Sequence, residues 1–303
     1  MAVKTVQAII NGVTTTLTYN SSTGKWEATV TAPTTSSYNN NDGHYYPVTI
    51  KATDEAGNVT TKNDTDTTLG NSLKLKVKEK TAPVITITYP SASALITNNK
   101  PAIAWKVTDN DSGVNSGSIK ITIDSGAAIT AGITKTAITG GYQCSYTPTT
   151  ALADGSHTIK IDASDNDGNA AAQKSVTFKL DTVPPTLNVT APVAGLITNK
   201  AACNVTGTTN DITSSPVTVT VKLNSGSAEA VTVGADGSFS KALTLASGSN
   251  TITVVATDSA GKSTTVTRTV TLDTVAPTIK AVTLTPNPVD AGKTYVISVE
   301  VTD

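Results

Sequence analysis

The sequence predicts an all-β protein built from tandem β-sandwich domains. Among its 303 residues, 38% are hydrophobic but only 4% are aromatic, and many short runs rich in Val and Thr end at Gly or Asn. No stretch of about a dozen residues repeats its apolar positions with the helical period. In addition, one short sequence unit returns at domain-sized intervals along the chain.

Three copies of this unit each end an alternating apolar run, at Thr53–Asn58, Ser164–Asn169 and Thr257–Lys262. After a further strand-like run, each copy is followed by a Pro-containing linker, at Thr81–Pro83, Thr182–Pro185 and Thr274–Pro277. The second and third copies lie about 90 residues apart, which fits whole domains in tandem and not the shorter units of a solenoid.

Alternating apolar residues predict the strands of each domain. In the second domain they lie at Val84–Tyr89, Ile103–Val107, Ile119–Ile123, Tyr142–Tyr146, Thr158–Ile161 and Ser175–Leu180. The third domain repeats this order at Leu187–Thr190, Cys203–Thr206, Val217–Leu223, Ser238–Leu243, Asn250–Ala256 and Ser263–Leu272. About six or seven strands in roughly 95 residues is the pattern of an immunoglobulin-like (Ig-like) sandwich, here without the disulfide of antibody domains.

The repeats and linkers predict three Ig-like sandwiches, at residues 1–80, 81–182 and 183–274, joined by short Pro-containing linkers. Residues 275–303 add two strands, which are too few to bury a core alone. Either the chain continues, or the hairpin folds onto the third domain, or its exposed edge pairs with another chain. For such pairing, the candidate attachment residues are Tyr295, Ile297, Val299 and Val301.

Charge and composition limit the partners of the protein. With 22 basic and 23 acidic residues and no basic block, the chain is not expected to bind nucleic acid. It has no apolar run of about 18 residues that would span a membrane. No secretory signal is visible at the amino terminus, although a chain from which a signal had been removed would look the same.

The residues that carry enzymatic chemistry are sparse. The sequence suggests no Ser–His–Asp or Cys–His pairing, no phosphate-binding loop and no zinc spacing, so it predicts a protein that is not an enzyme. His157 stands before a strand where the third domain carries Asn250, which favours a local hydrogen bond in a turn. Cys144 and Cys203 fall in different domains and are expected to be buried thiols. Trp26 and Trp105 are expected in the core.

Calcium is the one metal that the sequence suggests, and no other cofactor is expected. Several acids crowd two loops of the second domain, and calcium prefers six to eight oxygen ligands on bendable loops. The candidate ligands are Asp109, Asp111, Asp162, Asp165 and Asp167. The alternative is that these residues form ordinary β-turns, because Asp and Asn before Gly favour turns.

Certain segments resemble bacterial Ig-like domains. They are Leu152–Ile159, which leads into Asp165–Asn169, and the linkers Asp181–Pro185 and Asp273–Pro277. The resemblance covers nearly the whole chain and implies the Ig-like fold. In addition, Gly43–Asp54 and Leu284–Tyr295 look like proteins encoded among the tail genes of phages and prophages of Gram-positive bacteria.

This second resemblance implies a non-enzymatic structural or decoration protein of a phage tail or baseplate. Such a protein assembles in the host cytoplasm, is present in multiple copies on a symmetric virion, and contacts other tail proteins and host cell-wall glycan. Two alternatives remain open, because one fold serves many functions. They are a secreted adhesin or cell-surface stalk, and a glycan-binding accessory region of a polysaccharide hydrolase.

One loop of the first domain combines Tyr and Asn residues in the way that adaptable contact surfaces do. It is a candidate for recognition of a glycan or of a neighbouring tail protein. The alternative is that one Tyr is buried beneath the loop and the Asn residues only form turns. The residues concerned are Tyr38, Asn39, Asn40, Asn41, His44, Tyr45 and Tyr46.

Overall fold

A computed structural model describes residues 2–303 and confirms the all-β fold class. The single helix among these residues is the short 3-10 turn η1 (Gly70–Leu73). The described chain divides into two units, one reaching to Leu180 and the other spanning Asp181–Asp303. The first unit contains the first and second domains, and the second unit contains the third domain and the C-terminal hairpin.

The first domain contains η1 and six strands: β1 (Val3–Ile10), β2 (Val13–Asn20), β3 (Lys25–Glu27), β4 (Tyr46–Asp54), β5 (Val59–Lys62) and β6 (Lys74–Leu75). They hydrogen-bond in the order β3-β2-β1-β4-β5, and β6 pairs with the start of β4. Asn11 and Gly12 have φ angles of 48° and 77°, as required for the tight turn that joins β1 to β2. Its buried hydrophobic residues are few: Val6, Ala8, Tyr46 and Leu73.

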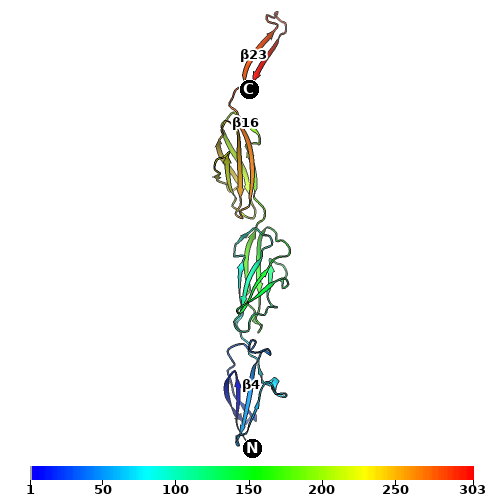
Figure 1. The fold of residues 1–303 in the computed structure, drawn as a ribbon, viewed down its shortest axis with the longest axis vertical. Coiled ribbons are helices and arrows are strands. Elements are labelled where there is room, and N and C mark those ends of the chain that lie inside the picture. The colour runs from blue at the N-terminus through cyan, green and yellow to red at the C-terminus, as the bar shows by residue number, and fades with distance from the viewer. Residues whose placement is uncertain (1) are drawn as a thin grey trace. The chain divides into compact units, whose positions relative to one another are not determined.

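The second domain is a sandwich of two four-stranded sheets (Figure 1). Its strands are β7 (Val84–Tyr89), β8 (Leu95–Ile96), β9 (Ile103–Thr108), β10 (Lys120–Ile123), β11 (Thr134–Ile138), β12 (Gly141–Tyr146), β13 (Gly155–Asp162) and β14 (Lys174–Leu180). One sheet has the order β10-β13-β14-β8 and the other β11-β12-β9-β7. The short strands β8 and β11 were not expected from the sequence.

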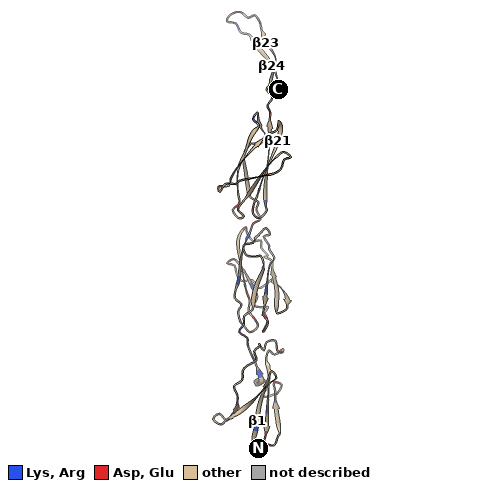
Figure 2. Ribbon diagram, turned by 90° about the vertical axis from the view of Figure 1, so that its left-hand side faces the viewer, with Lys and Arg blue, Asp and Glu red and all other residues tan. Residues whose placement is uncertain are grey.

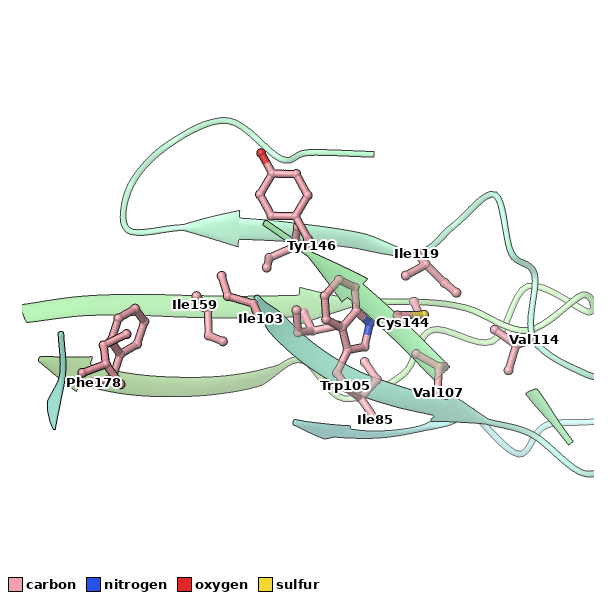
Figure 3. Close-up of a cluster of buried hydrophobic side chains, with 14 of the residues drawn as sticks. Ile85, Ile103, Trp105, Val107, Val114, Ile119, Cys144, Tyr146, Ile159 and Phe178 are labelled. Atoms are coloured by element: carbon pink, nitrogen blue, oxygen red, sulfur yellow. The ribbon is translucent and has the colours of Figure 1, made fainter. Parts of the chain in front are cut away.

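The core of the second domain fills the space between its two sheets. Trp105 of β9 is fully buried and, as Figure 3 shows, lies close to Cys144 of β12 and Ile85 of β7. Phe178 of β14 is also fully buried. Complete burial of one large apolar side chain stabilises a fold by about 1.5–3 kcal/mol, so this cluster accounts for the cohesion of a domain that has no disulfide.

The third domain repeats the architecture with a three-stranded sheet (β15-β17-β20) and a five-stranded sheet (β16-β22-β21-β18-β19). Its strands are β15 (Thr186–Ala191), β16 (Leu196–Thr198), β17 (Ala202–Asn210), β18 (Thr218–Leu223), β19 (Glu229–Val231), β20 (Ser238–Thr244), β21 (Gly248–Thr257) and β22 (Ser263–Leu272). Its core includes the fully buried Val205, Ile252, Val254 and Val270.

In both domains, one segment crosses from one sheet of the sandwich to the other. In the third domain, β19 pairs with β18, and Val233 then bridges to Phe239 of the opposite sheet. In the second domain, Ile129 first bridges to Ile121, and β11 then pairs with β12. The segment therefore crosses from one sheet to the other in the same way in both domains. The second domain has sheets of four and four strands and the third has sheets of three and five, because a different part of this segment forms a strand in each domain.

The C-terminal hairpin consists of β23 (Thr278–Thr285) and β24 (Val296–Thr302), which pair antiparallel. The first strand after each of the two preceding linkers also pairs antiparallel with the next long strand, as β7 does with β9 and β15 with β17. Every residue of β23 and β24 is exposed. The hairpin therefore repeats the opening pairing of a sandwich but does not bury its apolar side chains.

Candidate functional site

Two of the predicted calcium ligands lie together in loops of the second domain. Asp109 follows β9 and Asp165 lies beyond the end of β13, and both are more than nine-tenths buried. Glu79, from the segment that precedes β7, joins them, so that one carboxylate oxygen of each residue lies within 4.8 Å of the others. Figure 2 shows acidic segments in the loops of this domain, whereas most of the ribbon carries neither charge.

Backbone amides hold these carboxylates in place. Asp109 Oδ1 accepts hydrogen bonds from the amides of Asp111 (3.0 Å) and Gly113 (2.8 Å). Asp165 Oδ1 accepts one from the amide of Asn169 (2.8 Å), and Glu79 Oε1 accepts one from the amide of Ser112 (2.7 Å). The contacts of Asp109 and Asp165 are local turn contacts of the kind that Asp favours, whereas the contact of Glu79 joins the segment before β7 to the loop after β9.

The environment of Glu79 disfavours its charged form. Burial is the largest cause that raises the pKa of this carboxyl above its usual value, and the charges of Asp109 and Asp111 raise it further, against the hydrogen bond from Ser112. The Ser112 hydroxyl is buried and has no hydrogen-bond partner. The site thus combines repelling carboxylates with an unused polar group.

The other three predicted calcium ligands make different contacts. The two carboxylate oxygens of Asp111 accept hydrogen bonds from the backbone amide of Ser36 in the first domain, at 2.8 and 3.0 Å. Asp167 accepts the amide of Glu79 at 3.0 Å, and Asp162 accepts the side-chain amide of Gln173 at 2.9 Å. Of the five predicted ligands, the structure brings only Asp109 and Asp165 together. Sequence reasoning missed Glu79, which lies just before the linker and not in either acidic loop.

Most side chains of the candidate recognition loop bond within the first domain. Tyr46 is buried with its hydroxyl 2.7 Å from that of Thr35, and the Tyr45 hydroxyl donates to Asp64 (2.9 Å). The side-chain amides of Asn40 and Asn41 both donate to the Tyr45 carbonyl at 2.8 Å. These contacts shape the loop and leave few of its polar groups free.

The remaining residues of the loop are Tyr38, Asn39 and His44. The rings of Tyr38 and His44 stack with centroids 4.0 Å apart, and His44 is exposed. The side-chain amide of Asn39 donates to the carbonyl of Asp111 in the second domain at 2.5 Å. The loop therefore contributes to the contact between the first two domains, and its role in recognition stays a prediction.

The contacts of His157 confirm its expected role in a turn. Its Nε2 lies 2.7 Å from the Ala153 carbonyl and its Nδ1 lies 2.9 Å from Asp124. In the third domain, the Asn250 side chain donates to the Ala246 carbonyl (2.7 Å), and its oxygen accepts a hydrogen bond from the side-chain amide of Asn224 (3.1 Å). His157 and Asn250 thus stabilise the same turn in the two domains, one through an imidazole ring and the other through an amide.

Two further expectations concern core residues. Cys144 and Cys203 are buried and unpaired, as expected. Burial raises the pKa of the Cys144 thiol to about 11 and also raises that of Cys203, so neither is activated as a nucleophile. Trp105 is in the core, whereas Trp26 is only partly buried and packs on Tyr19 with ring centroids 5.7 Å apart. The core prediction was wrong for Trp26, because β3 lies at the edge of its sheet.

The candidate attachment residues lie on or beside β24. Tyr295, Ile297, Val299 and Val301 are all exposed, with between 48% and 58% of each residue accessible. Among residues 2–303, no helix has the length and apolar character needed to cross a lipid bilayer.

Comparisons with known proteins bear mainly on the fold. Residues 81–182 match the family described as a bacterial Ig-like domain, and residues 185–274 match the family described as domain B of glucodextranase. No curated protein matches the chain. The two family matches and the two-sheet architecture confirm the predicted Ig-like sandwich for the second and third domains. The strands of the first domain instead form one six-stranded sheet, and neither family match covers it.

Several solved structures are similar to this chain at low identity. The fibronectin(III)-like modules of CbhA from Clostridium thermocellum share 18% identity over 63% of this chain and 94% of that one, with a TM-score of 0.34. A multidomain fragment of titin shares 13% over 76% and 74%, with a TM-score of 0.41. Immunoglobulin domains of Sidekick-1 share 10% over 89% and 68%, with a TM-score of 0.39.

Proposed function

We propose that this protein is a non-enzymatic spacer of a phage tail or baseplate, in which tandem Ig-like domains hold a contact surface at a set distance from the body of the particle. The observation that supports this proposal most strongly is the linker between the first two domains. A spacer fixes position only if its domains do not swing freely, and this linker is held at several points.

The loops of the second domain bind both the segment that leads into the linker and the loop of the first domain that contains Ser36. The Asp167 carboxylate accepts a hydrogen bond from the Glu79 backbone amide, and the Asp167 backbone carbonyl accepts one from the Lys78 ammonium at 3.1 Å. Asn169 donates to the Glu79 carbonyl at 3.2 Å. Together with the hydrogen bonds from the Ser36 amide to Asp111, these contacts restrict rotation of the first domain relative to the second. This restriction favours a structural role over a catalytic one.

The partners follow from the surfaces that remain exposed. Among the described residues, one edge of β24 has no partner strand and the apolar row on this strand is exposed, which suits attachment to another tail protein. The exposed His44 and Asn40 of the first domain would contact host cell-wall glycan. Such a protein is present in multiple copies on a symmetric virion that assembles in the host cytoplasm.

Native particles provide the direct test. Phage particles purified from an induced culture would be analysed by mass spectrometry, alongside the cell-wall and medium fractions of the same culture. The proposal expects peptides of this chain to co-purify with tails and to keep a constant ratio to known tail proteins through a density gradient. Peptides confined to the wall or medium fraction would instead identify a cell-surface adhesin or stalk.

The family match of residues 185–274 supports a second candidate, an accessory region of a polysaccharide hydrolase, since glucodextranase is named for a polysaccharide-degrading activity. This candidate predicts that the purified chain sediments with an insoluble polysaccharide. The sedimented fraction would saturate with added protein and would fall when soluble oligosaccharide competes. Equal amounts in the pellet with and without the polysaccharide would dismiss this candidate.

A further inference from the structure

Three aspartates gather at one end of the third domain, where the sequence shows no acidic loop. Asp211 follows β17, Asp258 follows β21, and Asp181 immediately precedes the linker that leads into β15. One carboxylate oxygen of each lies within 4.8 Å of the others. Their exposed fractions are only 1% for Asp181, 8% for Asp211 and 6% for Asp258.

No cationic side chain offsets these charges. The ion pairs found among residues 2–303 involve Asp66, Asp124 and Glu229, and none involves the three aspartates. Moving carboxylates out of water is strongly unfavourable unless they are paired or bind a metal, and three like charges at this separation repel one another. The cluster therefore lacks a positive partner.

Hydrogen bonds satisfy part of the cluster and leave one oxygen unused. Asp211 Oδ1 accepts the amides of Thr213 (2.8 Å) and Ser214 (2.7 Å), and the Ser214 hydroxyl donates to Asp181. Asp258 Oδ1 accepts the amide of Lys262 (2.9 Å). The second oxygen of Asp258, Oδ2, is buried and has no hydrogen-bond partner. A buried acceptor without a partner is costly, and this one belongs to a carboxylate that faces two others.

We propose that Asp181, Asp211 and Asp258 bind a divalent metal ion of the calcium type. The donors are hard oxygens on loops, which is what calcium selects, and the cluster contains no His or Cys that would favour zinc. The ion supplies the missing positive charge and a ligand for Asp258 Oδ2. It also links the segment that leads into the third domain to two loops of that domain.

The second domain carries an equivalent cluster, which supports the assignment independently. Glu79 takes the place of Asp181 before the linker, Asp109 follows β9 as Asp211 follows β17, and Asp165 lies in the same repeated turn as Asp258. There too a buried polar atom, the Ser112 hydroxyl, has no partner. Two domains of different sequence thus keep three acids at the same three positions.

Calcium chloride is the probe for the test. The full chain, stripped of metal with a chelator, would be titrated by calorimetry, and its thermal unfolding would be followed with calcium or with chelator. Calcium at about 100 times its dissociation constant is expected to raise the Tm of the third domain by several degrees. In the variant Asp258→Asn, calcium should no longer raise the Tm of the third domain, and calorimetry should detect one calcium site fewer per chain.

Controls separate binding from folding. Asp236→Asn changes an exposed acid of the same domain outside the cluster, so it should bind as the parent does. In chelator, Asp258→Asn should melt no lower than the parent, because it removes one repelling charge. The proposal is overturned by an absence of calcium heat together with equal melting in calcium and chelator. It is also overturned if calcium binds but Asp258→Asn retains every site, whereas loss in Asp165→Asn alone would place the ion in the second domain only.

Discussion

At the scale of single residues, one position of the sandwich is filled by different chemistry in two domains. His157 and Asn250 each reach back to a carbonyl, that of Ala153 or Ala246, and each contacts a residue of positive φ, Asp124 or Asn224. A carbonyl and a carboxylate only accept hydrogen bonds, so both ring nitrogens of His157 must donate, and the protonated imidazolium fits best. In the third domain, the side-chain amides of Asn224 and Asn250 form the corresponding hydrogen bonds, and neither side chain is charged.

This difference predicts that the stability of the second domain depends on pH. Burial lowers the pKa of His157 and is the largest influence on it, but the hydrogen bonds to Ala153 and Asp124 and the charge of Asp124 together outweigh it and raise the pKa. A raised pKa stabilises the fold fully below the unfolded value of about 6.5, and this contribution is lost as the pH rises through the folded value.

We therefore expect the Tm of the second domain, followed by the fluorescence of Trp105, to fall as the pH rises from about 6 to about 9. The control is the double variant Asp124→Asn, His157→Asn, which copies the pair of the third domain and should show a flat profile over this range. A parent profile as flat as that of the variant would mean that His157 is neutral in the folded protein.

At the scale of elements, glycines mark where strands approach too closely for any side chain. A Cβ added to Gly141 of β12 would lie 2.0 Å from the carbonyl oxygen of Val107 in β9. A Cβ on Gly207 of β17 would lie 2.3 Å from the carbonyl oxygen of Asn188 in β15. Backbone atoms cannot rotate away as a side chain can, so both sheets depend on these two glycines.

We predict that Gly141→Ala destabilises the second domain by about 1–3 kcal/mol, the usual effect of overpacking. Urea unfolding followed by Trp105 fluorescence measures this change. The matched control is Gly117→Ala, where the added Cβ would approach only the Asn115 side-chain oxygen, at 3.3 Å. If both variants unfolded at the same urea concentration, β9 and β12 would not be as close as described.

The strands show how much of the fold the sequence could predict. The long strands alternate cleanly, and β7, β9, β13 and β22 lie where they were expected. The two-residue strand β8 carries too little pattern to be recognised, since its pairing with β14 depends on tertiary packing. The acidic sites were predicted only in part, because Glu79 and Asp181 reach their partners through the fold and not through nearby sequence.

At the scale of the whole molecule, hydrogen bonds from the second domain fix the segment that joins it to the first domain. The backbone of Glu79, just before the linker, forms hydrogen bonds with Asp167 and Asn169, and the Ser36 amide of the first domain donates to Asp111. Hydrogen bonds to charged groups contribute about 1.5–3 kcal/mol each, so removal of two of them should release the linker without unfolding either domain.

The double variant Asp111→Ala, Asp167→Ala is therefore expected to be cut by trypsin after Lys78 or Lys80 about ten times faster than the parent, if the loss of stabilisation exceeds about 1.4 kcal/mol. The Tm of the second domain should change little. Asp162→Ala is the control, since Asp162 bonds to Gln173 and not to the linker. An unchanged cleavage rate in the double variant would argue against a fixed linker.

The two buried thiols provide a separate means of observing each sandwich. Cys144 lies in the second domain, Cys203 lies in the third, and each is shielded from solvent. An alkylating reagent can reach either sulfur only when that sandwich opens, and mass spectrometry distinguishes the two labelled peptides. Brief labelling of the unmodified protein while it is stretched, heated or assembled into its native complex would therefore show which domain yields first.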